Sequence, residues 1–163
     1  MKTFTLLHVL ISLAGIFSGF IVLFGLLAGK RLEKLTAIFL ATTAATSVTG
    51  FFFPFHGVTP AIATGIVSLV VLAVAIFARY ARQLAGAWRK TYVISAVLAL
   101  YLNVFVLVVQ SFLKISALKE IAPNQNDPPF KLAQLVVLIA FVVLGVLAAI
   151  KFRDEPARAT SSA

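Results

Sequence analysis

Five long apolar runs divide the chain, and short polar or turn-forming stretches separate them. A bilayer core about 30 Å thick takes roughly 20 consecutive apolar residues of α-helix, and the runs approach or exceed that length. The pattern therefore predicts an all-α fold, an integral membrane bundle of five transmembrane helices. The predicted spans cover about residues 4–28, 35–53, 61–77, 92–113 and 132–150.

The stretches between the runs carry helix breakers. Pro54 ends the second run, and the short link that follows predicts an antiparallel hairpin, with Thr59 as the N-cap of the third span and Pro60 as its first residue. The longest connection contains a predicted helical turn over residues 115–121, and then a stretch rich in proline and asparagine that excludes regular helix. We expect one transmembrane domain over residues 1–152 and a disordered cytoplasmic tail over residues 153–163.

Composition agrees with a membrane protein. Hydrophobic residues make up 61% of the chain and charged residues only 12%, whereas about a quarter of a typical soluble domain is charged. Five spans leave no room for a soluble catalytic domain. The first run, from Thr3 to about Ala28, is too long for the apolar region of a signal peptide, so we expect it to remain as a span. The chain has no cysteine, which excludes disulfides, thiolate metal sites and cysteine nucleophiles.

The net charge of +9 predicts an orientation in the membrane. With five spans, one side carries four basic residues, namely Lys2, Lys114, Lys119 and Lys131. The other side carries ten, namely Lys30, Arg31, Lys34, Arg79, Arg82, Arg89, Lys90, Lys151, Arg153 and Arg158. Because basic residues accumulate on the cytoplasmic side, the N-terminus is expected outside and the C-terminus in the cytoplasm. Basic residues placed between apolar runs indicate anionic lipid headgroups as partners, and no nucleic acid.

Four glycines of the first span form two pairs with the spacing GxxxG, Gly15 with Gly19 and Gly25 with Gly29. Such pairs let another backbone approach closely, so we expect these glycines to serve helix packing. The same face offers a route to a homo-oligomer.

Larger polar side chains at membrane depth are few, and each needs a polar partner or a watery cavity. The candidates for ligand binding are His8, His56, Asn103, Gln110, Lys114 and Gln134. Asn103, Gln110 and Lys114 follow one stripe of the fourth span, since they are seven and four residues apart. With the orientation above, all the candidates except Asn103 fall toward the external side, which makes them candidates for one ligand-binding site, although the sequence does not determine whether they converge.

Two chemistries suit this set. His8 and His56 on neighbouring segments are the residue type that ligates haem iron. A quinone or lipid-like ligand needs only His8 or Gln110 as a hydrogen-bond partner in a phenylalanine-rich pocket. Neither is required by the sequence, which predicts no cofactor, no metal site and no catalytic residue. All five carboxylates lie outside the predicted spans, which argues against a proton-driven transporter.

The segment Leu7-His8-Val9, continued by Gly15, Gly19, Gly25 and then Lys30, resembles the opening of small, uncharacterised bacterial polytopic membrane proteins with a histidine early in the first helix. Some such families have a second histidine just after the first basic loop. This chain has Arg31-Leu32-Glu33-Lys34-Leu35 there, a departure that argues against a bis-histidine haem site. The resemblance covers about the first three spans and implies no activity.

These observations favour a non-enzymatic multi-pass protein of a bacterial inner membrane, an accessory or assembly component or one that binds a lipid-phase ligand. The alternatives are a redox-associated membrane protein that binds haem or quinone, and an oligomeric channel or transporter. A membrane-protein partner or a second copy of the chain fits the leading hypothesis.

Overall fold

The computed structural model describes residues 2–53, 57, 60–124 and 126–152, which form helices and connections without a strand. The elements are α1 (Lys2–Leu27), α2 (Glu33–Gly50), α3 (Pro60–Ile76), the π-helical segment η1 (Phe77–Ala81), α4 (Ala87–Lys114), α5 (Ser116–Ile121) and α6 (Pro128–Phe152). The all-α helical bundle expected from the sequence is thus confirmed. The predicted N-cap Thr59 and the predicted tail over residues 153–163 lie outside the described residues.

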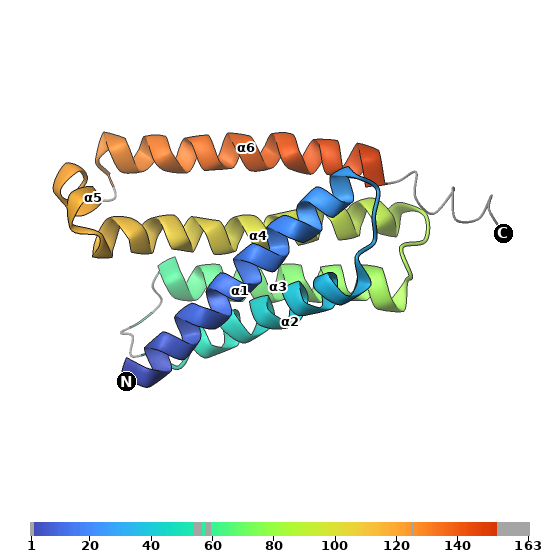
Figure 1. Ribbon diagram of the computed structural model, residues 1–163, viewed down its shortest axis with the longest axis horizontal. Helices are drawn as coiled ribbons and strands as arrows, with labels where there is room; N and C mark the ends of the chain where they lie inside the picture. The colour runs from blue at the N-terminus through green and yellow to red at the C-terminus, as the bar shows by residue number, and fades with distance from the viewer. Residues whose placement is uncertain (1, 54–56, 58–59, 125, 153–163) are drawn as a thin grey trace.

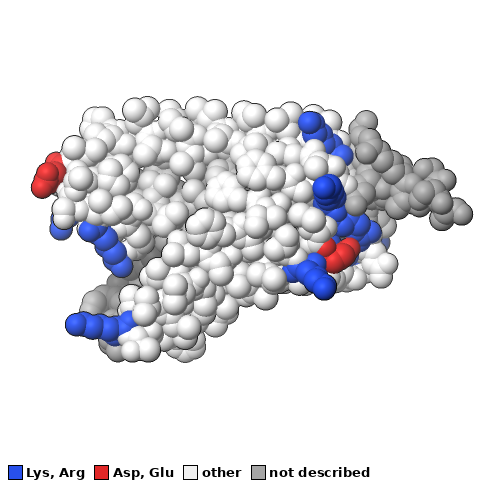
Figure 2. Space-filling view, in the orientation of Figure 1, with Lys and Arg blue, Asp and Glu red and all other residues white. Residues whose placement is uncertain are grey.

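Four helices are long and apolar enough to cross a membrane: α1, the segment Ile62–Ala81 that joins α3 to η1, α4 and α6. The chain is therefore a helical membrane protein, and the prediction of five spans is close. The N-terminus lies at the same end of the bundle as α5, and α6 finishes at the opposite end (Figure 1). Charged side chains lie at these two ends, and a broad band without charge separates them on the face shown in Figure 2.

Helix α2 is the least apolar of the five long helices, and its 18 residues give a length of about 27 Å. Most of its hydroxyl groups, those of Thr42, Thr46, Ser47 and Thr49, donate to carbonyls of the same helix. Thr42 donates to the Ile38 carbonyl over 2.6 Å, and Ser47 donates to the Thr43 carbonyl over 3.0 Å. Such bonds remove the need for water, so α2 fits in the same apolar layer as its neighbours.

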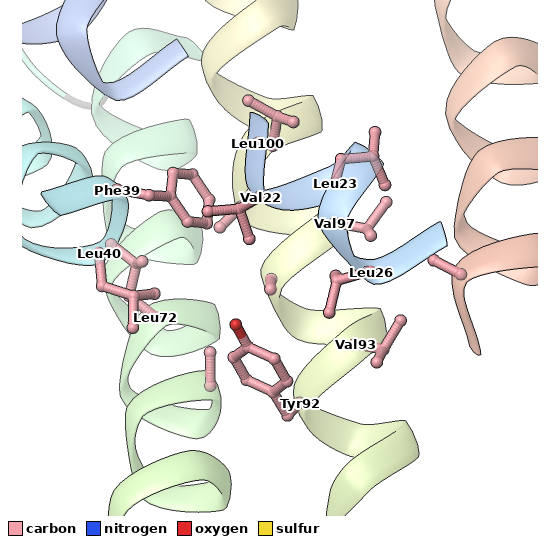
Figure 3. Close-up of a cluster of buried hydrophobic side chains, with 14 of the residues drawn as sticks. Val22, Leu23, Leu26, Phe39, Leu40, Leu72, Tyr92, Val93, Val97 and Leu100 are labelled. Carbon is pink, nitrogen blue, oxygen red and sulfur yellow. The ribbon is translucent and has the colours of Figure 1, made fainter. Parts of the chain in front are cut away.

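The core lies between α1, α2, α3 and α4, in the half of the bundle that holds the C-terminal end of α1. Figure 3 shows side chains from all four helices meeting there, with Tyr92 of α4 among them. Tyr92 and Val93 are completely buried, and Phe39 and Leu23 are 1% exposed. Helix α6 packs along α4 and also contacts α1. It keeps a long row of exposed aliphatic side chains, as expected of a helix that faces lipid.

The glycines of α1 allow its neighbours to approach closely. A Cβ at Gly15 would lie 3.2 Å from the Thr43 hydroxyl, and one at Gly19 would lie 2.6 Å from Leu100 Cδ1. At Gly25 the side chain of Leu32 occupies the space of the missing side chain. Gly29 instead ends the helix with φ +74°, where Lys30 N–H bonds to the Gly25 carbonyl over 2.7 Å and Gly29 N–H to the Leu26 carbonyl over 3.1 Å.

Gly19→Ala is expected to destabilise the protein by about 1–3 kcal/mol, since the new methyl group meets the buried side chains of Leu100 and Phe39. Thermal unfolding in mild detergent, followed by circular dichroism, measures the loss. Gly50→Ala is the matched control, because a Cβ there meets only His8 Cε1 at 3.8 Å. Equal midpoints for the two variants would contradict the packing role of Gly19.

Candidate functional site

The side chain of His8 fastens α1 to α2. Its Nδ1 lies 2.7 Å from the Thr49 hydroxyl oxygen, and that hydroxyl donates to the Ala45 carbonyl over 2.7 Å. When the Thr49 proton goes to the Ala45 carbonyl, the Thr49 oxygen accepts from Nδ1–H of His8, and Nε2 is then the nitrogen with a lone pair. The ring of Phe53 meets the imidazole edge-on, with centroids 5.0 Å apart.

Asn103 plays the same part between α4 and α2. Its amide donates to the Thr43 hydroxyl over 3.4 Å, close to the surface of Gly15. Thr43 is completely buried, so this contact puts two polar groups side by side in the middle of the bundle. A polar contact of this kind gives each group a partner inside the bundle.

Gln134 joins α6 to α4 by donating to the Phe105 carbonyl over 3.3 Å, while its own carbonyl oxygen is buried without a hydrogen-bond partner among the described residues. Gln110 is half-buried and Lys114 is exposed. His56 lies outside the described residues. The three hydrogen-bonded candidates thus join three different pairs of helices.

A further polar group lies at the opposite end of the bundle, where sequence reasoning placed only an exposed basic connection. Arg79 is 2% exposed. It belongs to η1, in which the Arg82 N–H bonds to the Phe77 carbonyl five residues back, over 3.0 Å. The wider π turn rotates the residues that follow relative to an α-helix, and here it leaves both Ala78 and Arg79 buried.

The guanidinium of Arg79 contacts three other parts of the chain. Nη2 donates to the Arg31 carbonyl over 3.0 Å and lies 3.1 Å from the Glu33 carboxylate. Cζ lies 5.1 Å from the centre of the Tyr92 ring, a cation–π contact. Arg79 therefore ties η1 to the connection between α1 and α2, to the start of α2 and to α4.

The Arg31 carbonyl lies in the connection between α1 and α2, where none of the described helices supplies a backbone N–H to bind it. Leu32, the next residue, has φ +46°, so no regular helix continues there. The Thr36 hydroxyl also donates to this carbonyl, over 3.1 Å. Glu33 completes the cluster with its second oxygen, 3.1 Å from Arg31 Nε. One carboxylate thus lies between two arginines.

A shallow cavity of about 160 Å³ opens beside this cluster and is lined by Arg31, Glu33, Arg79, Tyr80 and Gln83. Arg79 Nε and Nη1 are buried without a hydrogen-bond partner among the described residues. The cavity has room for ordered water. The cluster is an ion pair that links helices at the end of the bundle where α1 and η1 end.

Sequence reasoning missed Arg79 because it stands among exposed basic residues at the end of an apolar run. The signal was the spacing of Leu72, Ala75 and Ala78, a buried stripe that leads directly to it. The expected end of the third span at Phe77 was therefore too early for the helix, which runs on through η1 to Ala81.

The chain matches no known protein-family model, and neither a curated protein nor a solved structure is similar to it. Within the described part of the chain, no three histidine, cysteine or acidic side chains lie close enough together to hold a metal ion.

Glu33→Gln is expected to lower the free energy of unfolding by about 1–3 kcal/mol, because the buried charge of Arg79 loses its counter-charge. In an Arg79→Met background, the same change should cost less than about 1 kcal/mol, the helix-dipole effect of an acidic residue in a first turn. A double-mutant cycle by thermal unfolding in detergent measures this coupling.

The control is Glu120→Gln, which removes an exposed carboxylate from α5 at the other end of the bundle. A loss at Glu33 no larger than the loss at Glu120 would show that the Arg79 cluster contributes nothing to stability.

Proposed function

We propose that the protein is a non-enzymatic multi-pass protein of a bacterial inner membrane, an accessory component that acts by holding a lipid-phase ligand or a membrane-protein partner. One observation carries the proposal: the interior polar side chains fasten pairs of helices. His8 is committed to Thr49, Asn103 to Thr43 and Gln134 to the backbone of α4. Arg79 is committed to Arg31 and Glu33.

Side chains used in this way make a rigid scaffold. An enzyme or a proton carrier instead needs polar groups that change partners during a cycle. The outer surface of this bundle is the part left for interaction, and it is apolar along α6 and basic at the end that holds Arg79. A lipid-phase ligand or a membrane partner fits such a surface.

A second candidate, binding of haem or quinone, has one observation in its favour. The contact of His8 Nδ1 with the Thr49 hydroxyl fixes the imidazole ring, and in the tautomer with the proton on Nδ1 it leaves Nε2 available as a ligand or hydrogen-bond acceptor. The other histidine that this hypothesis invokes, His56, lies outside the described residues.

Native mass spectrometry of the protein released from mild detergent tests the proposal. We expect the chain to retain a partner chain or a lipid-phase ligand. A mass that matches haem or a quinone, lost in His8→Leu, would favour the second candidate. A bare monomer, with no partner captured by crosslinking in intact membranes, would contradict both.

The proposed orientation is tested by thiol labelling, because the chain has no cysteine of its own. Ser116→Cys in α5 and Ala85→Cys in the turn between η1 and α4 place exposed thiols at opposite ends of the bundle. A membrane-impermeant maleimide should label Ser116→Cys in intact cells, and Ala85→Cys only after permeabilisation, as the distribution of basic residues predicts. The reverse pattern would contradict an external N-terminus.

A further inference from the structure

A groove of about 220 Å³ runs between α4 and α6 near the basic end of the bundle. Helix α4 contributes Lys90 and Ile94, and α6 contributes Gly145, Val146, Ala149 and Ile150. All of these except Lys90 are apolar. The groove is therefore lined by apolar side chains and one cationic side chain.

Small residues on one stripe of α6 create the groove. Gly145 and Ala149 are four residues apart, so they lie on the same face, as do Lys90 and Ile94 of α4. A Cβ at Gly145 would lie 3.3 Å from Val97 Cγ1, which shows how closely α6 approaches α4 there. The walls remain open, since Ile94 is 59% exposed and Ile150 is 56% exposed.

The position of Lys90 along α4 puts its amine at the headgroup level. Trp88 lies two residues earlier, with its ring against Phe77 at a centroid distance of 5.2 Å and the Arg82 guanidinium 5.5 Å from its ring centre. Tryptophan beside arginine is typical of the membrane–water boundary. From Lys90 to Ile94 the helix rises about 6 Å, so the groove leads from headgroup depth into the hydrocarbon.

Among the described residues, no ion pair involves Lys90. Both ion pairs found among the described residues involve Glu33, which lies between Arg31 and Arg79. Glu120 and Asp127 belong to the connection at the opposite end of the bundle. The part of the chain that the structure describes thus offers Lys90 no carboxylate partner.

We propose that this groove binds an anionic phospholipid, with one acyl chain along Gly145 and Ala149 and the lipid phosphate on Lys90. The inference rests on the proposed function, in which the protein holds a lipid-phase ligand, and it names the chemical class of that ligand. The apolar lining selects a hydrocarbon chain, and the single cation at its mouth selects a negative headgroup over a zwitterionic one.

Titration of the delipidated protein in mild detergent, followed by native mass spectrometry, tests the proposal. The probes are phosphatidylglycerol and phosphatidylcholine with the same acyl chains. The wild-type chain should bind its first phosphatidylglycerol about fivefold more tightly than phosphatidylcholine. Lys90→Gln should abolish that preference. Lys34→Gln is the matched control, since it removes an exposed charge at the same end, in α2 away from the groove, and should keep the preference.

Ala149→Leu fills the floor of the groove and should weaken the binding of both lipids while Lys90 is retained. If this variant fails to fold, the lipid preference of Lys90→Gln, a substitution at an exposed position, still tests the proposal. Equal binding of phosphatidylglycerol by the wild type and Lys90→Gln, or equal binding of the two lipids by the wild type, would overturn the proposal. A different lipid-phase ligand retained from the membrane in that case would leave the proposed function standing.

Discussion

The structure depends on one constraint, that a polar group inside an apolar bundle needs a hydrogen-bond partner within the protein because no water reaches it. Several hydroxyls of α2 find that partner in their own helix, and the larger polar side chains find it through a few long-range bonds between helices. His8 binds Thr49, Asn103 binds Thr43, and Gln134 binds the Phe105 carbonyl. At the boundary, Arg79 binds a connection whose carbonyl has lost its helical partner. The polar groups therefore set the register of the bundle, while apolar contacts fill the space between them.

Close approach of α1 to its neighbours makes these bonds geometrically feasible. The missing side chain of Gly15 leaves space for the Thr43 hydroxyl and the amide of Asn103. One turn later, that of Gly19 leaves space for Leu100 and Phe39. The absence of two side chains on α1 thus serves both packing and hydrogen bonding. At the far end of the same helix, Gly29 turns the chain so that Leu32 packs on Gly25 and the Arg31 carbonyl meets Arg79. One run of glycines links the middle of the bundle to its basic end.

A scaffold fixed in this way leaves its outer surface for interaction. The two ends differ in charge, and the lipid-facing side of α6 is interrupted by Gly145 and Ala149, where a groove forms beside Lys90. The features that support an accessory or ligand-binding role therefore lie outside the core, in the layer where the protein meets lipid. Arg79 and Lys90 lie at the same end of the bundle and differ in burial: Arg79 is buried, and Lys90 is exposed.

The sequence by itself determined that the protein lies in a lipid bilayer, that its fold is helical and roughly where its long helices lie. Apolar runs of bilayer length rarely form any other structure. The helical turn predicted at 115–121 also appears, as α5. Which polar residues meet was decided only by the tertiary structure. His8 and Thr49 are 41 residues apart in the chain, and Arg79 and Arg31 are 48 apart. The burial of Arg79 depends on a π turn, on an orphaned carbonyl and on the ring of Tyr92. Local periodicity carries no information about such partners, since they come together only when the helices pack.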